Sequence, residues 1–152
     1  MNEKRLTHIN RENRPEMVDV SDKPLSHRIA KAYGKILLDK NTCLLISDNK
    51  IKKGNVLITA ELAGTMGGKK TSELIPLCHP LNITKLTVKA SLMDDCVEVF
   101  SEAVCNGQTG VEMEALTAVS IALLTVYDMC KAVDKNMVIS EIKLLEKTKT
   151  LV

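Results

Sequence analysis

Hydrophobic and polar residues alternate along several segments of the chain, and a period of two predicts β-strands. Residues 28–38 place small or apolar side chains at the even positions from Ala30 to Leu38, between Lys31, Tyr33 and Lys35. Residues 86–92 and 97–105 alternate in the same way on either side of two aspartates, which predicts a hairpin. Residues 137–145 predict a last strand.

Helices are expected between these strands. A short one is expected over 41–47, and two more over 54–64 and 69–77, broken at Gly67-Gly68 and stopped by Pro76. Residues 109–133 predict a long helix, for which Thr109 and Glu112 have the spacing of a capping box. The order β-α-α-β-β-α-β predicts an α+β, ferredoxin-like fold with helices on one face of a four-stranded antiparallel sheet.

The long helix is apolar nearly all round, because no charged residue occurs from Ala115 to Tyr127. A helix packed on a single sheet needs only one apolar stripe. We therefore expect a second subunit to cover the remaining apolar face. The uncharged run of 13 residues is shorter than the roughly 20 needed to span a bilayer, so no membrane span is expected.

Composition narrows the class of protein. With 152 residues, 45% of them hydrophobic and 26% charged, the chain suits a soluble globular domain. We expect residues 1–20 to form a flexible arm and 21–152 to form one domain, with no secretory signal. A net charge of +2 does not indicate nucleic-acid binding. Five cysteines without a C-x-x-C pair favour reduced thiols in the cytoplasm and no metal site or cofactor.

Asp128 and Lys131 are the first candidates for chemistry. They stand at i and i+3, and therefore on one face of the helix end. A surface ion pair explains the spacing equally well, although a helix C-terminus disfavours the negative charge. Glu114 lies 14 residues before Asp128, or about 21 Å along the helix, so both can serve one site only if two subunits share it.

His79 follows Cys78 in a rigid segment between two prolines, which favours general acid or base chemistry over metal binding. A buried free cysteine is usually a small apolar residue. The stretch "GTMGGKKT" fails the Walker spacing, because three residues instead of four separate Gly64 from Gly68-Lys69. Lysines beside these glycines can still contact a phosphate, although a solvated surface is the commoner explanation.

The motifs "LCHPL", "TGVEMEALTA" and "YDMCKAV", with "LTHIN" and "MVDVS" near the start, resemble the molybdenum cofactor biosynthesis protein C family, the cyclic pyranopterin monophosphate synthases. The resemblance extends from about Leu6 to Lys147. It implies a lyase that converts a cyclised GTP intermediate to cyclic pyranopterin monophosphate and releases pyrophosphate. It also implies a hexamer, a trimer of dimers, with the active site at the dimer interface.

The resemblance also implies site residues. It makes Asp128, Lys131 and Lys53 catalytic, and we consider the hypothesis that a lowered pKa lets Lys131 act as a base. It implies substrate contacts for nine further residues: Leu77, Cys78, His79, Met113, Glu114, Glu112, Arg28, Lys69 and Lys147.

Two alternatives remain at this point. A non-catalytic, small-molecule-binding regulatory domain would explain an oligomer and a pocket, but not the Asp128–Lys131 pair. RNA binding on the sheet face would require aromatic side chains for base stacking, and the strands offer only Tyr33 and Phe100.

Overall fold

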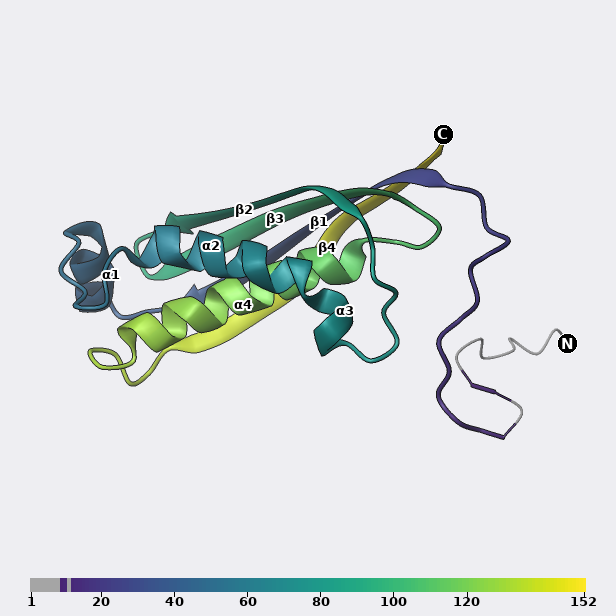
Figure 1. Cartoon of the computed structure of the whole chain (residues 1–152). Coiled ribbons are helices and arrows are strands. Elements are labelled where there is room, and N and C mark those ends of the chain that lie inside the picture. Colours follow the sequence, from purple (N-terminus) through teal and green to yellow (C-terminus); the bar gives the residue numbers. More distant parts are fainter. Residues whose placement is uncertain (1–8, 11) are drawn as a thin grey trace, which may run out of the picture.

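The computed structural model describes residues 9–10 and 12–152. Its elements follow the order expected from the sequence, except that three helices, and not two as in the order β-α-α-β-β-α-β, separate the first two strands (Figure 1). They are β1 (Ser26–Leu37), α1 (Lys40–Ser47), α2 (Val56–Lys69), α3 (Thr71–Leu74), β2 (Ile83–Leu92), β3 (Cys96–Gly107), α4 (Glu112–Cys130) and β4 (Val138–Leu151).

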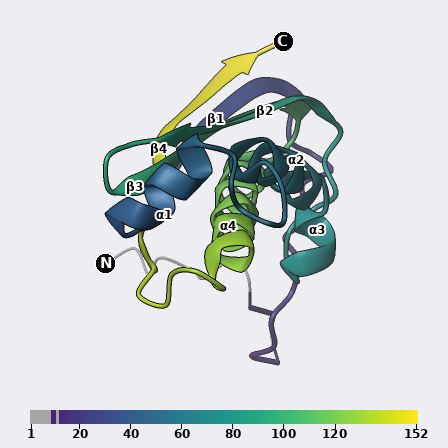
Figure 2. The same ribbon diagram turned by 90° about the vertical axis from the view of Figure 1, so that its left-hand side faces the viewer.

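The four strands form one antiparallel sheet in the order β2-β3-β1-β4. The two long helices α2 and α4 lie side by side on one face of the sheet, and the other face is open (Figures 1 and 2). The two strands that precede α2 and α4 in the chain, β1 and β3, occupy the centre of the sheet. This arrangement confirms the predicted α+β, ferredoxin-like fold.

The alternation of β1 is confirmed, since the even positions Ala30, Ala32, Gly34, Ile36 and Leu38 are all buried. On the open face, the rings of Tyr33 and Phe100 lie 4.9 Å apart. Tyr33 is itself only 8% exposed and its hydroxyl donates to Glu98 at 2.8 Å. One ring of the pair is thus hidden, which leaves little stacking surface for bases.

The predicted helix break at Gly67-Gly68 is wrong, because α2 continues to Lys69. Gly67, together with Gly64 one turn earlier, allows α2 and α4 to approach closely. A Cβ on Gly64 would lie 2.7 Å from the carbonyl oxygen of Ala118, and one on Gly67 would lie 2.5 Å from Cγ1 of Ile121. Contact with α4 therefore outweighs the low helix propensity of glycine.

The capping box predicted for α4 is also wrong. The helix begins at Glu112 with Val111 as its N-cap, and no side chain caps it. It ends at Cys130, with Lys131 as its C-cap. By length and composition α4 is the one helix among the described residues that could cross a membrane, but more than half of it is buried in the core.

The chain before β1 is only partly described, since residues 1–8 and 11 lie outside the described residues together with most of "LTHIN". Ile9 and Pro15 form an isolated bridge. Further along, the side-chain amide of Gln108 donates to the carbonyl oxygens of Ser21 and Lys23, at 3.0 Å each. The division into a flexible arm over 1–20 and a domain over 21–152 stays a prediction.

Candidate active site

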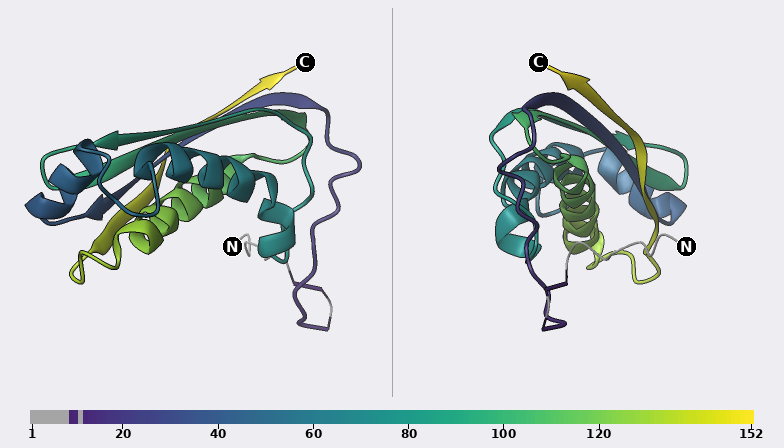
Figure 3. Two further views of the ribbon diagram at one scale, coloured as in Figure 1. Left: turned by 60° about the vertical axis from the view of Figure 1, so that its left-hand side comes forward. Right: turned by 90° about the vertical axis from the view of Figure 1, so that its right-hand side faces the viewer.

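The candidate residues gather at the two ends of α4. The C-terminal end of this helix lies at the end of the molecule that carries α1, and its N-terminal end lies at the end that carries α3 and the segment before β1 (Figures 1 and 3). Three of the twelve predicted residues lie at the first end, eight lie at the second, and Lys69 lines a further hollow. A single chain thus holds two separate groups, as the distance along the helix predicts.

At the C-terminal end, one carboxylate binds two lysines. Lys131 donates to Oδ1 of Asp128 at 2.7 Å, and Lys53 donates to Oδ2 at 2.6 Å and to the backbone oxygen at 3.0 Å. Lys53 reaches this point because α2, which runs antiparallel to α4, begins just after it at the N-cap Asn55. All three side chains are about half exposed.

These contacts set the protonation of the Lys53–Asp128–Lys131 cluster. Hydrogen bonds from Lys131 and then Lys53 lower the pKa of Asp128 to about 2. The pKa of Lys131 is raised, chiefly by its hydrogen bond with Asp128. The hypothesis of a lowered pKa for Lys131 is therefore wrong for this chain, because its nearest charge is a carboxylate and not a second cation. At neutral pH the cluster is one carboxylate with two ammonium groups.

The N-terminal end of α4 borders a pocket of about 390 Å³. Leu77, Cys78 and His79 form one wall, and another is formed by Thr109, Gly110 and residues 112–114. The pocket thus brings together two of the motifs that carry the resemblance. Val18, Val20 and Lys23, from the segment before β1, line it as well. Sequence reasoning did not assign them to the site, and the "MVDVS" motif was the signal available for the two valines.

Glu114 is the buried acid of this pocket. It is 4% exposed, and its Oε2 has no hydrogen-bond partner within the part of the chain that the structure describes. Burial raises the pKa of Glu114, the neighbouring charge of Glu112 raises it further, and a backbone N–H opposes both. A carboxyl group in this state holds its proton at a higher pH than an exposed one, and so can donate it.

His79 and Cys78 differ in their capacity for chemistry. Nε2 of His79 lies 2.7 Å from the carbonyl oxygen of Val18, so this nitrogen carries the hydrogen and Nδ1 is free to accept. The pKa of Cys78 is raised, first by burial and then by Glu114 and Glu112. The thiol of Cys78 therefore stays protonated and is a poor nucleophile.

Three basic residues predicted for the site take different positions around the pocket. Lys147 pairs with Glu112 at 3.4 Å, while Arg28 donates to the carbonyl oxygens of Gly107 and Gln108, at 3.1 Å each. Arg28 and Lys147 line a hollow of about 280 Å³ that shares Glu112 with the pocket. Lys69 lines a further hollow of about 450 Å³. Arg28 thus supports the loop before α4 through hydrogen bonds to its backbone.

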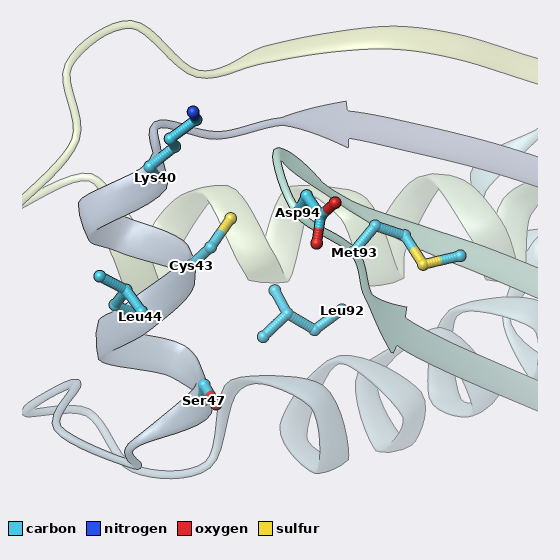
Figure 4. A pocket seen from close by; sticks show the side chains of 7 residues that line it. All are labelled: Lys40, Cys43, Leu44, Ser47, Leu92, Met93 and Asp94. Carbon is cyan, nitrogen blue, oxygen red and sulfur yellow. The ribbon is translucent and has the colours of Figure 1, made fainter.

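A larger cavity, of about 690 Å³, lies elsewhere, between one face of α1 and the turn from β2 to β3 (Figure 4). Its lining is mainly Cys43, Leu44, Leu92 and Met93, with Lys40, Ser47 and Asp94 as polar members. None of the candidate residues borders it, so size alone does not identify the site. Within residues 9–10 and 12–152, no three His, Cys, Asp or Glu side chains are grouped to hold a metal ion.

Comparison with known proteins covers nearly the whole chain. The model of the MoaC family matches residues 17–150. Cyclic pyranopterin monophosphate synthase of Heliobacterium modesticaldum is 52% identical over 94% of this chain and 91% of its own length. Its namesake from a Thermoanaerobacter species is also 52% identical, over 94% and 92%. Molybdenum cofactor biosynthesis protein 1 of Drosophila melanogaster is 48% identical over 97% of this chain, but over 26% of its own length. The chain therefore belongs to the MoaC family.

Proposed function

We propose that this chain is a cyclic pyranopterin monophosphate synthase of molybdenum cofactor biosynthesis. The reaction would convert the 3′,8-cyclised dihydro-GTP intermediate to cyclic pyranopterin monophosphate, with release of pyrophosphate. One observation carries the proposal: relatives with this name share about half of their residues with this chain over more than nine-tenths of both sequences. The chemistry of the two residue groups is consistent with it.

The Lys53–Asp128–Lys131 cluster supplies charge and a proton acceptor. Lys53 and Lys131 are half-exposed ammonium groups, so they can bind phosphate oxygens and stabilise charge on the leaving pyrophosphate. Asp128 is ionised and can accept a proton but not donate one. Its basicity is low while both lysines hold it. If one lysine leaves Asp128 to pair with a phosphate, the pKa of Asp128 would rise and Asp128 would become a better base.

The pocket at the other end supplies a proton donor. Glu114, with its raised pKa and unpartnered Oε2, is placed to donate a hydrogen bond or a proton to a bound ring, whereas His79 offers Nδ1 as an acceptor because its Nε2–H donates to Val18. Ring opening and pterin closure require both donors and acceptors of protons. We therefore assign donation to this pocket and acceptance to Asp128.

A complete site needs both groups at one substrate, and we propose that a second copy of the chain provides this. On α4, residues 113, 116, 120, 124, 127 and 131 lie on one face at spacings of three or four residues. Leu124 and Tyr127 on this face are 54% and 39% exposed. Two α4 helices packed antiparallel along it would place the cluster of one chain beside the pocket of the other.

Assembly of three such dimers into a hexamer is implied by the family resemblance and remains part of the proposal. A cytoplasmic location suits the five cysteines, all of which are unpaired. No cofactor is required by these residues, because every role assigned above is proton transfer or charge stabilisation.

A single-turnover assay of the cyclised GTP intermediate, following pyrophosphate release, tests the function. We expect turnover by wild type and a loss of about 10²-fold or more in Asp128→Asn and Lys131→Ala, given the usual contribution of acid–base groups. Lys50→Ala is the matched control, since Lys50 lies near Lys53 in the same loop but pairs with Asp48 at 2.9 Å. Its turnover should equal that of wild type.

Absence of pyrophosphate release by folded wild type would contradict the proposal and favour a non-catalytic regulatory domain instead. If Asp128→Asn is as active as wild type, the synthase assignment stands, but Asp128 takes no part in the chemistry.

A further inference from the structure

Two segments of the chain meet at the Lys53–Asp128–Lys131 cluster. The cluster stays assembled only if these segments keep their relative positions. Lys53 comes from the loop between α1 and α2, whereas Asp128 and Lys131 come from the end of α4. Besides the packing of α2 against α4, the link between the segments at the cluster is the pair of hydrogen bonds from Lys53 to Asp128. Both side chains are about half exposed, and exposed ion pairs hold geometry weakly.

A second link is buried, and Asp134 provides it. This residue is 2% exposed and lies in the turn that follows α4. Its Oδ2 accepts a hydrogen bond from the backbone N–H of Asp39 at 2.9 Å, and its Oδ1 accepts one from the N–H of Asn136 at 2.9 Å. Its own N–H donates to the carbonyl oxygen of Cys130 at 3.0 Å. The carboxylate thus joins the end of α4 to the chain at Asp39.

Asp39 extends this connection to α1. It is the N-cap of that helix, and its Oδ1 accepts from the N–H of Thr42 at 2.6 Å. The loop that carries Lys53 follows the other end of α1, which is only eight residues long. Asp134 therefore fixes the end of α4 to the helix that carries the Lys53 loop.

We propose that Asp134 is a positioning residue that keeps Lys53 within reach of Asp128 by tying the turn after α4 to the start of α1. Asp134 contacts no substrate in this scheme and acts through the backbone. The consequence for catalysis rests on the proposed function, whereas the consequence for the geometry of the cluster does not.

The test compares Asp134→Ala, which removes both acceptors, with Asp134→Asn, which keeps the shape and one acceptor oxygen. Ser101→Ala is the matched control: Ser101 is 4% exposed and its hydroxyl donates to the backbone of α4 at Ala115, far from the cluster. The direct readout is the titration of the Asp128 carboxyl by NMR under conditions where each variant is folded.

In Asp134→Ala we expect the pKa of Asp128 to rise from about 2 toward 3.8, because Lys53 is no longer held against it. Asp134→Asn should fall between Asp134→Ala and wild type, and Ser101→Ala should leave the titration unchanged. If the chain is a synthase, kcat of Asp134→Ala should fall on the order of tenfold to a hundredfold, as for other displacements of reacting groups.

An unchanged Asp128 titration in folded Asp134→Ala overturns the proposal. If both Asp134 variants fail to fold, Asp134 belongs to the core alone, and the proposal is equally overturned. Failure of wild type to release pyrophosphate would remove the proposed function but leave the NMR result decisive for Asp134.

Discussion

The close contact between α2 and α4 predicts that Gly64→Ala destabilises the fold, whereas helix propensity alone predicts that it stabilises it. Replacing Gly64 by Ala in an isolated helix would stabilise it by about 1 kcal/mol through helix propensity. In this fold the new Cβ would lie 2.7 Å from the carbonyl oxygen of Ala118, 3.0 Å from Cγ1 of Val88 and 3.1 Å from Cβ of Ala122. The nearest atom belongs to the main chain, so a side-chain rotation cannot relieve the contact and the helices must separate.

Overpacking of a core costs about 1–3 kcal/mol, and a contact with main chain belongs at the upper end. Subtracting the propensity gain leaves Gly64→Ala destabilised by about 2 kcal/mol. For a chain of this size that is a fall in Tm of roughly 4–8 °C. Thermal unfolding at a fixed protein concentration measures it, because association would otherwise shift Tm.

Gly67→Ala is the control, since its crowding comes from one side chain. The new Cβ would lie 2.5 Å from Cγ1 and 2.8 Å from Cβ of Ile121. Adding Ile121→Ala removes Cγ1 and the rest of the side chain beyond Cβ, so it should recover part of the loss, whereas the same change should not rescue Gly64→Ala. A Tm above that of wild type in Gly64→Ala would refute the reasoning, because propensity would then outweigh the contact.

Two further predictions concern the site and the subunit contact. Glu114→Gln should raise Tm near pH 7.5 and not below pH 4: a raised pKa means that ionising Glu114 destabilises the folded chain as pH rises through that pKa, and Gln removes this cost. An equal Tm change at both pH values would contradict a raised pKa for this buried carboxyl. Leu124→Asp should shift the protein toward monomer in analytical ultracentrifugation, because it places charge on the exposed apolar face of α4. An unchanged molar mass would place the subunit contact elsewhere.

The strands were predictable from sequence because alternation is a local pattern that burial on one face imposes directly. The course of α2 was not, because Gly67 and Gly68 read as a break until their partner on α4 is known. The predicted start of α4 is also wrong. Thr109 and Glu112 have capping-box spacing, but the helix begins at Glu112 itself, so Thr109 is not its N-cap.

The candidate site, like the fold, is only partly predictable from the sequence. The face shared by Asp128 and Lys131 follows from their spacing, and the separation of Asp128 from Glu114 follows from helix length. The pairing with Lys53 required the fold, since 75 residues separate it from Asp128. The raised pKa of Lys131 follows from Asp128, which the same spacing places beside it, and not from a second cation as the hypothesis of a lowered pKa assumed.

The sharing of one carboxylate by two lysines also affects how a ligand arrives. Asp128 balances only one of the two ammonium groups, so the cluster presents an excess positive charge to solvent. A field of this kind accelerates the diffusional encounter with an anion, and dissolved salt screens it within about 8–10 Å. The ionic strength of the medium would thus govern how quickly a phosphorylated ligand is captured. It would have little effect on steps that follow once the phosphates have replaced the water around the lysines.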